Sequence, residues 1–71
     1  MRLRQTLADN LKRERRVRGW SQEEFADRAQ IDRTYVSSIE RCRYAVTIDV
    51  LEKLADALSI DPVTLIQRSV S

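Results

Sequence analysis

Hydroxyl and guanidinium side chains recur at helical spacing between residues 33 and 41. Val36 and Ile39 lie among them at the spacing of a helix that buries one face. The opposite face has no carboxylate and consists of Arg33, Thr34, Ser37, Ser38 and Arg41. A guanidinium group can bond a guanine edge twice, hydroxyls bond either base type, and a threonine methyl can touch a thymine methyl. The segment therefore predicts a helix that reads the major groove of DNA, with an ordinary solvated face as the alternative.

A shorter helix is expected directly before this one. Ser21 is expected to cap it, with Glu24 completing a capping box three residues later. Trp20 and Phe25 occupy the two positions of a hydrophobic staple at the same helix start. These residues together predict a helix that begins at Ser21 and runs to about Ala29.

A tight turn joins the two helices. The Asp32 carboxylate can accept hydrogen bonds from the free N–H groups of the second helix, and Ile31 and Val36 form its staple. Only residues 30–31 separate the two helices, and this geometry defines a helix-turn-helix. We therefore predict a helix-turn-helix over about residues 21–41.

The rest of the chain predicts further helices and no strand. One Gly and one Pro among 71 residues disfavour a protein built from strands and turns. The first helix, ending at Gly19, has an apolar stripe of Leu3, Leu7, Ala8 and Leu11. A fourth helix, capped by Thr47, has an apolar face of Ile48, Leu51, Leu54, Ala55 and Leu58. Asp61 and Pro62 start a fifth. The prediction is one all-α domain of five helices over residues 1–71.

Candidates for phosphate contacts lie on both sides of the reading helix. Ser21 and Gln22 open a helix, where free N–H groups form a natural phosphate site. The candidates that follow the reading helix are Arg41, Arg43 and Tyr44. Arg2 and Arg4 either form an N-terminal basic arm on the DNA or are part of a disordered basic tail.

One pair of charged residues has a structural interpretation. Arg15 lies one turn beyond Leu11 on the apolar stripe, and Glu40 lies one turn beyond Val36 near the inner edge of its helix. A partly buried charge is costly unless it is paired. We therefore expect an ion pair between Arg15 and Glu40 that ties the first helix to the reading helix.

Composition excludes most chemistry. The chain has 13 basic and 11 acidic residues, no His and a single cysteine, Cys42. No disulfide framework, metal-ligand set, phosphate loop or catalytic arrangement is evident, so we expect no enzyme activity, no metal and no cofactor. No membrane span or signal peptide is visible, so we expect a cytoplasmic protein. Residues 1–45 hold 11 basic and 7 acidic residues. Such a basic region suits a polyanionic partner, and a solvated surface with chance clustering of charge is the alternative.

The last two helices hold more apolar residues than one small core uses. The surplus residues are Val50, Ile60, Val63, Leu65 and Ile66. They predict a homodimer with a dimerisation region over about residues 48–68, and a monomer core that uses all of them is the alternative. A symmetric dimer would place its reading helices in successive major grooves, ~34–36 Å apart, on a near-palindromic operator.

With these residues identified, the chain resembles the Cro/C1-type (XRE-like) helix-turn-helix regulators, which have a lambda-repressor-like fold. The matching stretches are RRVRGWSQEEFADRAQID, RTYVSSIER and TIDVLEKLADALSIDPVTLI. The segment IDRTYVSSIER most resembles the controller proteins of restriction–modification systems, homodimers that regulate their own gene and time endonuclease expression. The resemblance implies base or nearby backbone contacts by Arg33, Thr34, Tyr35 and Ser38, and a phosphate contact by Gln22.

The chain departs from the family pattern where many members carry glycine. Gln30, Cys42 and Ser59 stand at those turns, and each would cost on the order of 1 kcal/mol if the turn keeps a positive φ. Cys42, beside two arginines, is either a redox sensor or an incidental small residue at a helix end.

Other functions remain open for the same scaffold. A phage-type repressor or an antitoxin-like autoregulator would use the same DNA-reading face, and RNA polymerase is a further candidate partner. A protein-interaction module on this scaffold would bind DNA weakly, since a fold does not determine function. The chain ends at Ser71 without an effector domain, so no small-molecule effector is expected.

Overall fold

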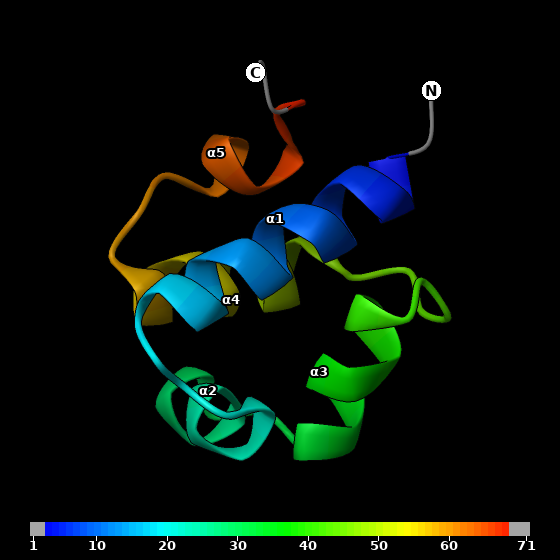
Figure 1. The fold of residues 1–71 in the computed structure, drawn as a ribbon. Helices are drawn as coiled ribbons and strands as arrows, with labels where there is room; N and C mark the ends of the chain where they lie inside the picture. Colours follow the sequence, from blue (N-terminus) through cyan, green and yellow to red (C-terminus); the bar gives the residue numbers. More distant parts are fainter. Residues whose placement is uncertain (1–2, 69–71) are drawn as a thin grey trace.

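The computed structural model describes residues 3–68, which form five helices and contain no strand. The helices are α1 (Leu3–Val17), α2 (Gln22–Ala29), α3 (Arg33–Glu40), α4 (Ile48–Leu58) and α5 (Pro62–Ile66) (Figure 1). The predicted all-α fold of five helices is confirmed, and α2 and α3 lie within one residue of the expected helix-turn-helix boundaries.

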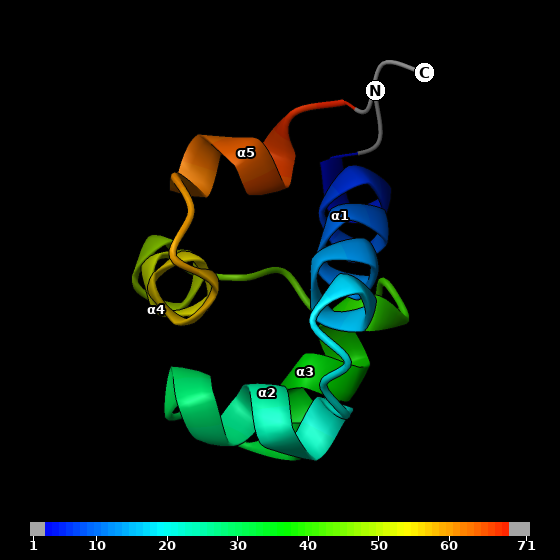
Figure 2. The same cartoon turned by 60° about the vertical axis from the view of Figure 1, so that its left-hand side comes forward.

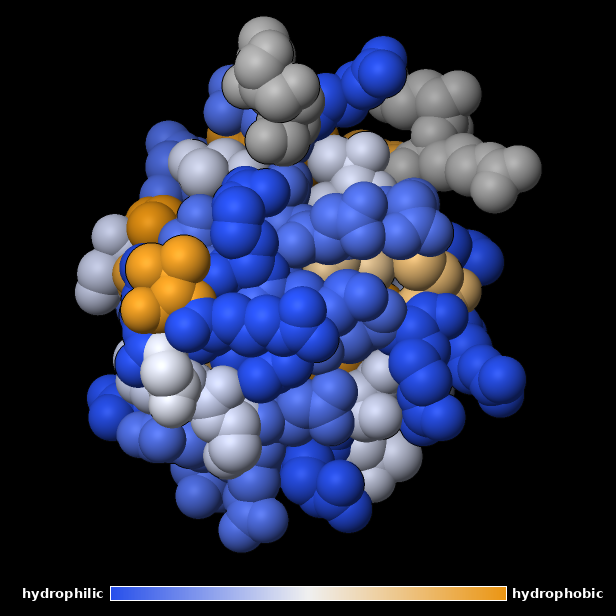
Figure 3. Space-filling view, viewed as in Figure 1, coloured by the Kyte–Doolittle hydropathy of each residue, from blue (hydrophilic) through white to orange (hydrophobic). Residues whose placement is uncertain are grey.

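The helices surround one apolar core. α1 and α4 lie on opposite sides of the molecule, α5 closes one end, and α2 and α3 close the other (Figure 2). All five helices contribute to the core, and its largest fully buried apolar side chains are Phe25, Leu11, Ile39, Leu54, Leu65 and Val36. The surface in front of α1 is largely hydrophilic, with only small apolar areas (Figure 3). The core therefore holds α3 at one end of the molecule.

Side-chain caps begin the last four helices, as predicted. Each cap accepts a hydrogen bond of 2.8–3.1 Å from a backbone N–H two or three residues ahead, and the caps are Ser21, Asp32, Thr47 and Asp61. The capping box at α2 is only half formed. The Glu24 carboxylate accepts from Arg28 Nη2 at 2.8 Å, so the i,i+4 ion pair occupies it.

The first four helices all end in a left-handed residue. These residues are Gly19, Gln30, Cys42 and Ser59, with φ between 58° and 72°. At each end, two backbone N–H groups bond back to carbonyls of the last turn, as Cys42 N to Ile39 O and Arg43 N to Ser38 O do after α3. The three non-glycine residues therefore keep the strained geometry that glycine would adopt freely.

Three residues differ in burial from the sequence prediction. Ile48, predicted on the core face of α4, is the first residue of its helix and is 77% exposed. Leu65, counted among the surplus apolar residues, is 0% exposed and belongs to the core. Leu3, expected on the apolar stripe of α1, is also half-exposed.

α1 makes polar contacts that the sequence analysis did not anticipate. The buried Asn10 amide donates to Leu65 O at 2.9 Å and to Gln67 O at 2.8 Å, at the end of α5. Arg18 Nη2 donates to Leu58 O at 2.8 Å, at the end of α4. Both contacts supply donors to carbonyls that helix ends leave without an intrahelical partner.

Candidate nucleic-acid interface

α3 separates buried and exposed side chains as its sequence predicts. Val36 and Ile39 are buried against the core, and Arg33 and Thr34 are exposed at the first turn. Farther along the outer side, the half-buried residues are Tyr35, Ser37 and Ser38. The structure thus brings the five predicted base-contacting residues together on one helix, at one end of the molecule.

The start of α3 is ordered by its cap. The backbone N–H of Thr34 donates to Asp32 Oδ1 at 2.8 Å. This hydrogen bond is the main reason why the pKa of the Asp32 carboxyl lies below its ordinary value. Arg33 lowers the same pKa by its charge. Within residues 3–68 no carboxylate forms an ion pair with Arg33. Its guanidinium group is therefore exposed next to an ordered helix start.

Glu40 lies at the centre of a buried polar network at the other end of α3. Arg15 Nε and Nη2 donate to its two carboxylate oxygens at 2.7 and 3.0 Å, so the predicted ion pair is present. Their side chains are only 11% and 3% exposed. Arg15 Nη1 also donates to Trp20 O at 2.8 Å, which ties the network to the turn before α2. The network therefore fixes α3 relative to α1 and α2.

Gln22, a candidate phosphate contact, is also part of this network. Its Nε2 donates to Glu40 Oε1 at 3.0 Å. An amide nitrogen carries two protons, so this bond leaves one donor available at the N-terminus of α2. Ser21 beside it is exposed, and its hydroxyl caps α2.

The remaining candidates follow α3. Arg41 and Arg43 are exposed on the turn after the helix. Tyr44 is 54% exposed, and its ring stacks on that of Tyr35 with centroids 5.0 Å apart and planes 20° apart. The sequence predicts separate DNA contacts for the two tyrosines, and their contact with each other is a finding of the structure. Cys42 Sγ lies 3.3 Å from Gln5 Oε1 of α1.

The suggested N-terminal arm falls partly outside the described residues. Arg2 lies outside them. Arg4 belongs to the first turn of α1, which begins at Leu3, so it is helical rather than part of an extended arm.

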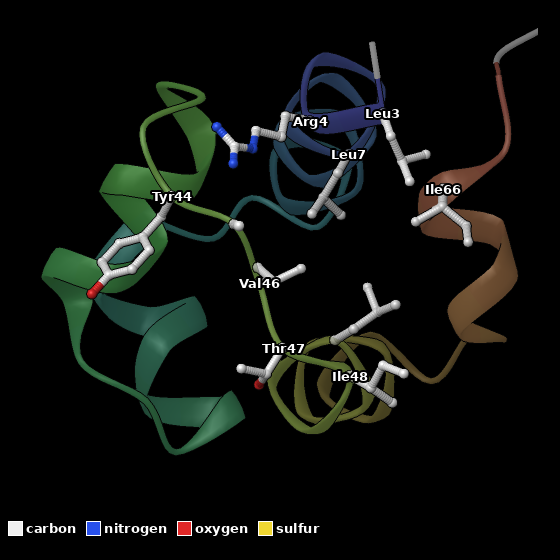
Figure 4. Close-up of a pocket in the computed structure, with 10 residues that line it drawn as sticks. Leu3, Arg4, Leu7, Tyr44, Val46, Thr47, Ile48 and Ile66 are labelled. Carbon is white, nitrogen blue, oxygen red and sulfur yellow. The ribbon is translucent and has the colours of Figure 1, made fainter. Parts of the chain in front are cut away.

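The predicted dimerisation residues differ in their burial. Leu65 is a core residue, as described above, and cannot present its side chain to a partner. Val50 and Ile60 are half-buried against the core, whereas Val63 is 52% exposed. Ile66 lines an apolar groove of about 360 Å³ between α1, α4 and α5, together with Leu3, Leu7, Val46, Ile48 and Leu51 (Figure 4). Leu3 and Ile48 extend the apolar surface that the sequence analysis assigned to α4 and α5.

Within residues 3–68, no three side chains among the Cys, Asp and Glu residues come together in a way that could hold a metal ion. None of the helices in this range is both long and apolar enough to cross a bilayer.

The helix-turn-helix family model matches residues 11–65 of the chain. This match extends over most of the chain, from the middle of α1 to the last turn of α5. The chain therefore belongs to the Cro/C1-type helix-turn-helix family of DNA-binding transcription regulators, which are not enzymes. Regulators of this family bind double-stranded DNA.

Similar proteins include a hypothetical transcription factor from Neisseria meningitidis, a control protein and a restriction–modification controller protein. The Neisseria sequence is 47% identical over 58 residues, and the match covers 82% of this chain and 55% of that protein. A Neisseria crystal structure of that description has a TM-score of 0.90 at 42% identity, over 93% of this chain and 76% of the other.

Both controllers match over most of their length. Control protein C.SmaI from Serratia marcescens is 35% identical over 68 residues, covering 96% of this chain and 81% of the controller. The crystal structure of the restriction–modification controller C.AhdI from Aeromonas hydrophila has a TM-score of 0.84 at 35% identity, over 87% of this chain and 94% of the other.

Proposed function

We propose that this protein is a homodimeric transcription regulator that reads a near-palindromic operator with α3. In the most specific form of this proposal, it is the controller of a restriction–modification system and regulates its own gene and the endonuclease gene. The similarity to C.SmaI and C.AhdI supports this form, because it extends over most of both controllers.

The observation that carries the proposal is the outer face of α3. Arg33 and Thr34 are exposed at the start of the helix, the end that contacts base edges in helix-turn-helix proteins. Arg33 has no ion-pair partner among the described residues. Its guanidinium N–H groups are therefore available to donate to guanine O6 and N7. Ser37 and Ser38 follow on the same helix and offer hydroxyls to either base type.

Phosphate contacts would supply the orientation and much of the affinity. Gln22, with one amide proton free of Glu40, and the exposed Ser21 lie at the start of α2. Arg41 and Arg43 lie beyond the other end of α3. Contacts on both sides of the reading helix would hold it in the major groove, while the base contacts supply the sequence preference.

A second copy of the chain would pair through α4 and α5. Val63 and Ile48 are exposed, and Ile66 and Val50 are partly exposed. Ile48 and Ile66 line the same apolar groove. A two-fold axis through this surface would give two reading helices and make operator binding steep in protein concentration.

The test is selection of binding sites from random duplex DNA at one fixed salt concentration, because phosphate-dominated affinity changes steeply with salt. We expect wild type to enrich a two-fold symmetric motif. Arg33→Ala should lose ~1–3 kcal/mol of discrimination at one base position in each half-site, because a bidentate contact is removed.

Arg68→Ala is the matched control, because it removes the same charge from an exposed arginine that follows α5. It should select the wild-type motif. The proposal is wrong if wild type enriches no motif, or if Arg33→Ala and Arg68→Ala are indistinguishable. An enriched motif without two-fold symmetry would contradict the homodimer alone.

A further inference from the structure

The aromatic pair formed by Tyr35 and Tyr44 joins α3 to the segment that follows it. The rings are stacked, with centroids 5.0 Å apart and planes 20° apart. Tyr35 also packs against the apolar core on its inner side. The Tyr35 ring is therefore held between the core and Tyr44.

The backbone on both sides of Tyr44 is anchored. After α3 the chain reverses at Cys42, whose φ is 59°, and Arg43 N bonds back to Ser38 O at 2.9 Å. Beyond Tyr44, Val46 packs against the core and Thr47 caps α4. Figure 4 shows the Tyr44 side chain directed toward α3 and away from the apolar groove that its backbone borders. The position of the Tyr44 ring is therefore set by a backbone that is held on both sides.

We infer that Tyr44 is a positioning residue for DNA reading, which holds the Tyr35 ring in the orientation in which it meets the bases. This inference rests on the proposed function, in which the outer face of α3 reads the operator. It gives Tyr44 a role that does not require its hydroxyl, whereas a direct phosphate contact by Tyr44 would require it.

The physical reason is pre-organisation. A tyrosine side chain that is free to change rotamer must be immobilised when it enters a DNA interface, and this costs binding free energy. Stacked aromatic pairs favour a narrow range of ring positions. With Tyr44 present, the Tyr35 side chain is already immobilised in the folded protein, so the free energy of operator binding is not reduced by this step. Removing the Tyr44 ring should therefore weaken specific binding about 2- to 10-fold per half-site.

The experiment compares Tyr44→Ala and Tyr44→Phe on the selected operator and on variants with single base changes. Tyr44→Phe keeps the stacked ring and removes only the hydroxyl, so it should bind like wild type. Tyr44→Ala should lose affinity and should relax the preference at the same base position as Tyr35→Ala. In the Tyr35→Ala background, Tyr44→Ala should have no further effect, because the group it positions is absent.

A second measurement needs no DNA. The χ1 couplings of Tyr35, measured by NMR, should report one rotamer in wild type and in Tyr44→Phe, and averaging between rotamers in Tyr44→Ala. Thermal unfolding of the three proteins checks that the half-exposed position 44 tolerates the changes.

Three results would overturn the inference while leaving the proposed function intact. Tyr44→Phe could weaken all sequences uniformly, as loss of a phosphate contact does. The affinity losses of Tyr35→Ala and Tyr44→Ala could multiply in the double variant, which would show that the two residues act independently. Alternatively, Tyr35 could keep one rotamer in Tyr44→Ala. If wild type selects no motif at all, the proposed function fails, and the inference fails with it.

Discussion

α1 contacts α3 and α5 through buried polar groups of different kinds. Toward α3, Arg15 forms a two-point ion pair with Glu40, and Gln22 adds a third donor. Toward α5, the neutral amide of Asn10 donates to backbone carbonyls, of which Leu65 O and Gln67 O are the nearest. In both places the buried donor or carboxylate is fully partnered, and the described residues contain no buried side-chain N or O atom without a partner.

The difference between the two contacts lies in what remains when one partner is lost. Without Arg15, a carboxylate that is 3% exposed would have to stay charged in the protein interior or bind a proton. Without Asn10, only neutral carbonyls would remain, and Gln67 is exposed enough for water to reach it. The position of α3 should therefore be enforced more strongly than the position of α5.

The largest expected effect is on the α3 side. Arg15→Met keeps much of the side-chain volume but leaves Glu40 without its cation, and should lower the free energy of unfolding by about 3–5 kcal/mol. Urea unfolding of Arg15→Met and wild type at neutral pH measures this loss of stability. The double variant Arg15→Met/Glu40→Leu is the control, because it removes both charges and should recover much of the loss. A loss below about 1 kcal/mol for Arg15→Met, typical of exposed ion pairs, would show that the pair does not hold α3.

A smaller effect is expected on the α5 side. Asn10→Leu is similar in volume and removes the amide, so the carbonyls at the end of α5 lose their donor, at a cost of about 1–3 kcal/mol. Hydrogen exchange should show faster opening of α5, with α3 unchanged. Gln5→Leu, also on α1 but at an exposed position, is the control. Equal protection of α5 in Asn10→Leu and wild type would contradict the role assigned to Asn10.

A substitution at the end of α4 should raise the free energy of unfolding rather than lower it. Arg18 supplies a donor to Leu58 O there, while the next residue, Ser59, has a φ of 58°. Ser59→Gly relieves the left-handed strain without removing the donor, and should raise stability by about 1 kcal/mol. Thermal unfolding measures the shift. Ser59→Ala, which keeps a Cβ atom, should bring no gain, and an equal gain in both variants would exclude backbone strain as the cause.

Much of the site could be predicted because its determinants are local or mutually dependent. The caps Ser21 and Asp32 act within three residues, so the start of each helix of the helix-turn-helix is encoded where it occurs. The pairing of Arg15 with Glu40 could be predicted because each charge, on an apolar helix face, requires the other. The separation of Val36 and Ile39 from Arg33 and Thr34 followed from helical periodicity alone.

Other features depended on how the helices pack. α5 has only five residues, too few for periodicity to distinguish the buried Leu65 from the exposed Val63. Asn10 bonds to backbone carbonyls, which every residue carries, so no partner could be identified from side-chain chemistry. The Tyr35–Tyr44 stack depends on a chain reversal at Cys42, a residue type that rarely adopts the left-handed conformation.

The sequence by itself therefore determined the helices, their caps, the helix-turn-helix and the polar face of α3, because these depend on hydrogen bonds and spacings within a few residues. Only the tertiary structure decided that Leu65 is buried while Ile48 is exposed, and that Asn10 holds α5 and Tyr44 holds Tyr35. The physical reason is that burial and contacts between elements depend on where five helix faces meet. Asn10 and Thr64, for example, are 54 positions apart in sequence and become neighbours only when the core assembles.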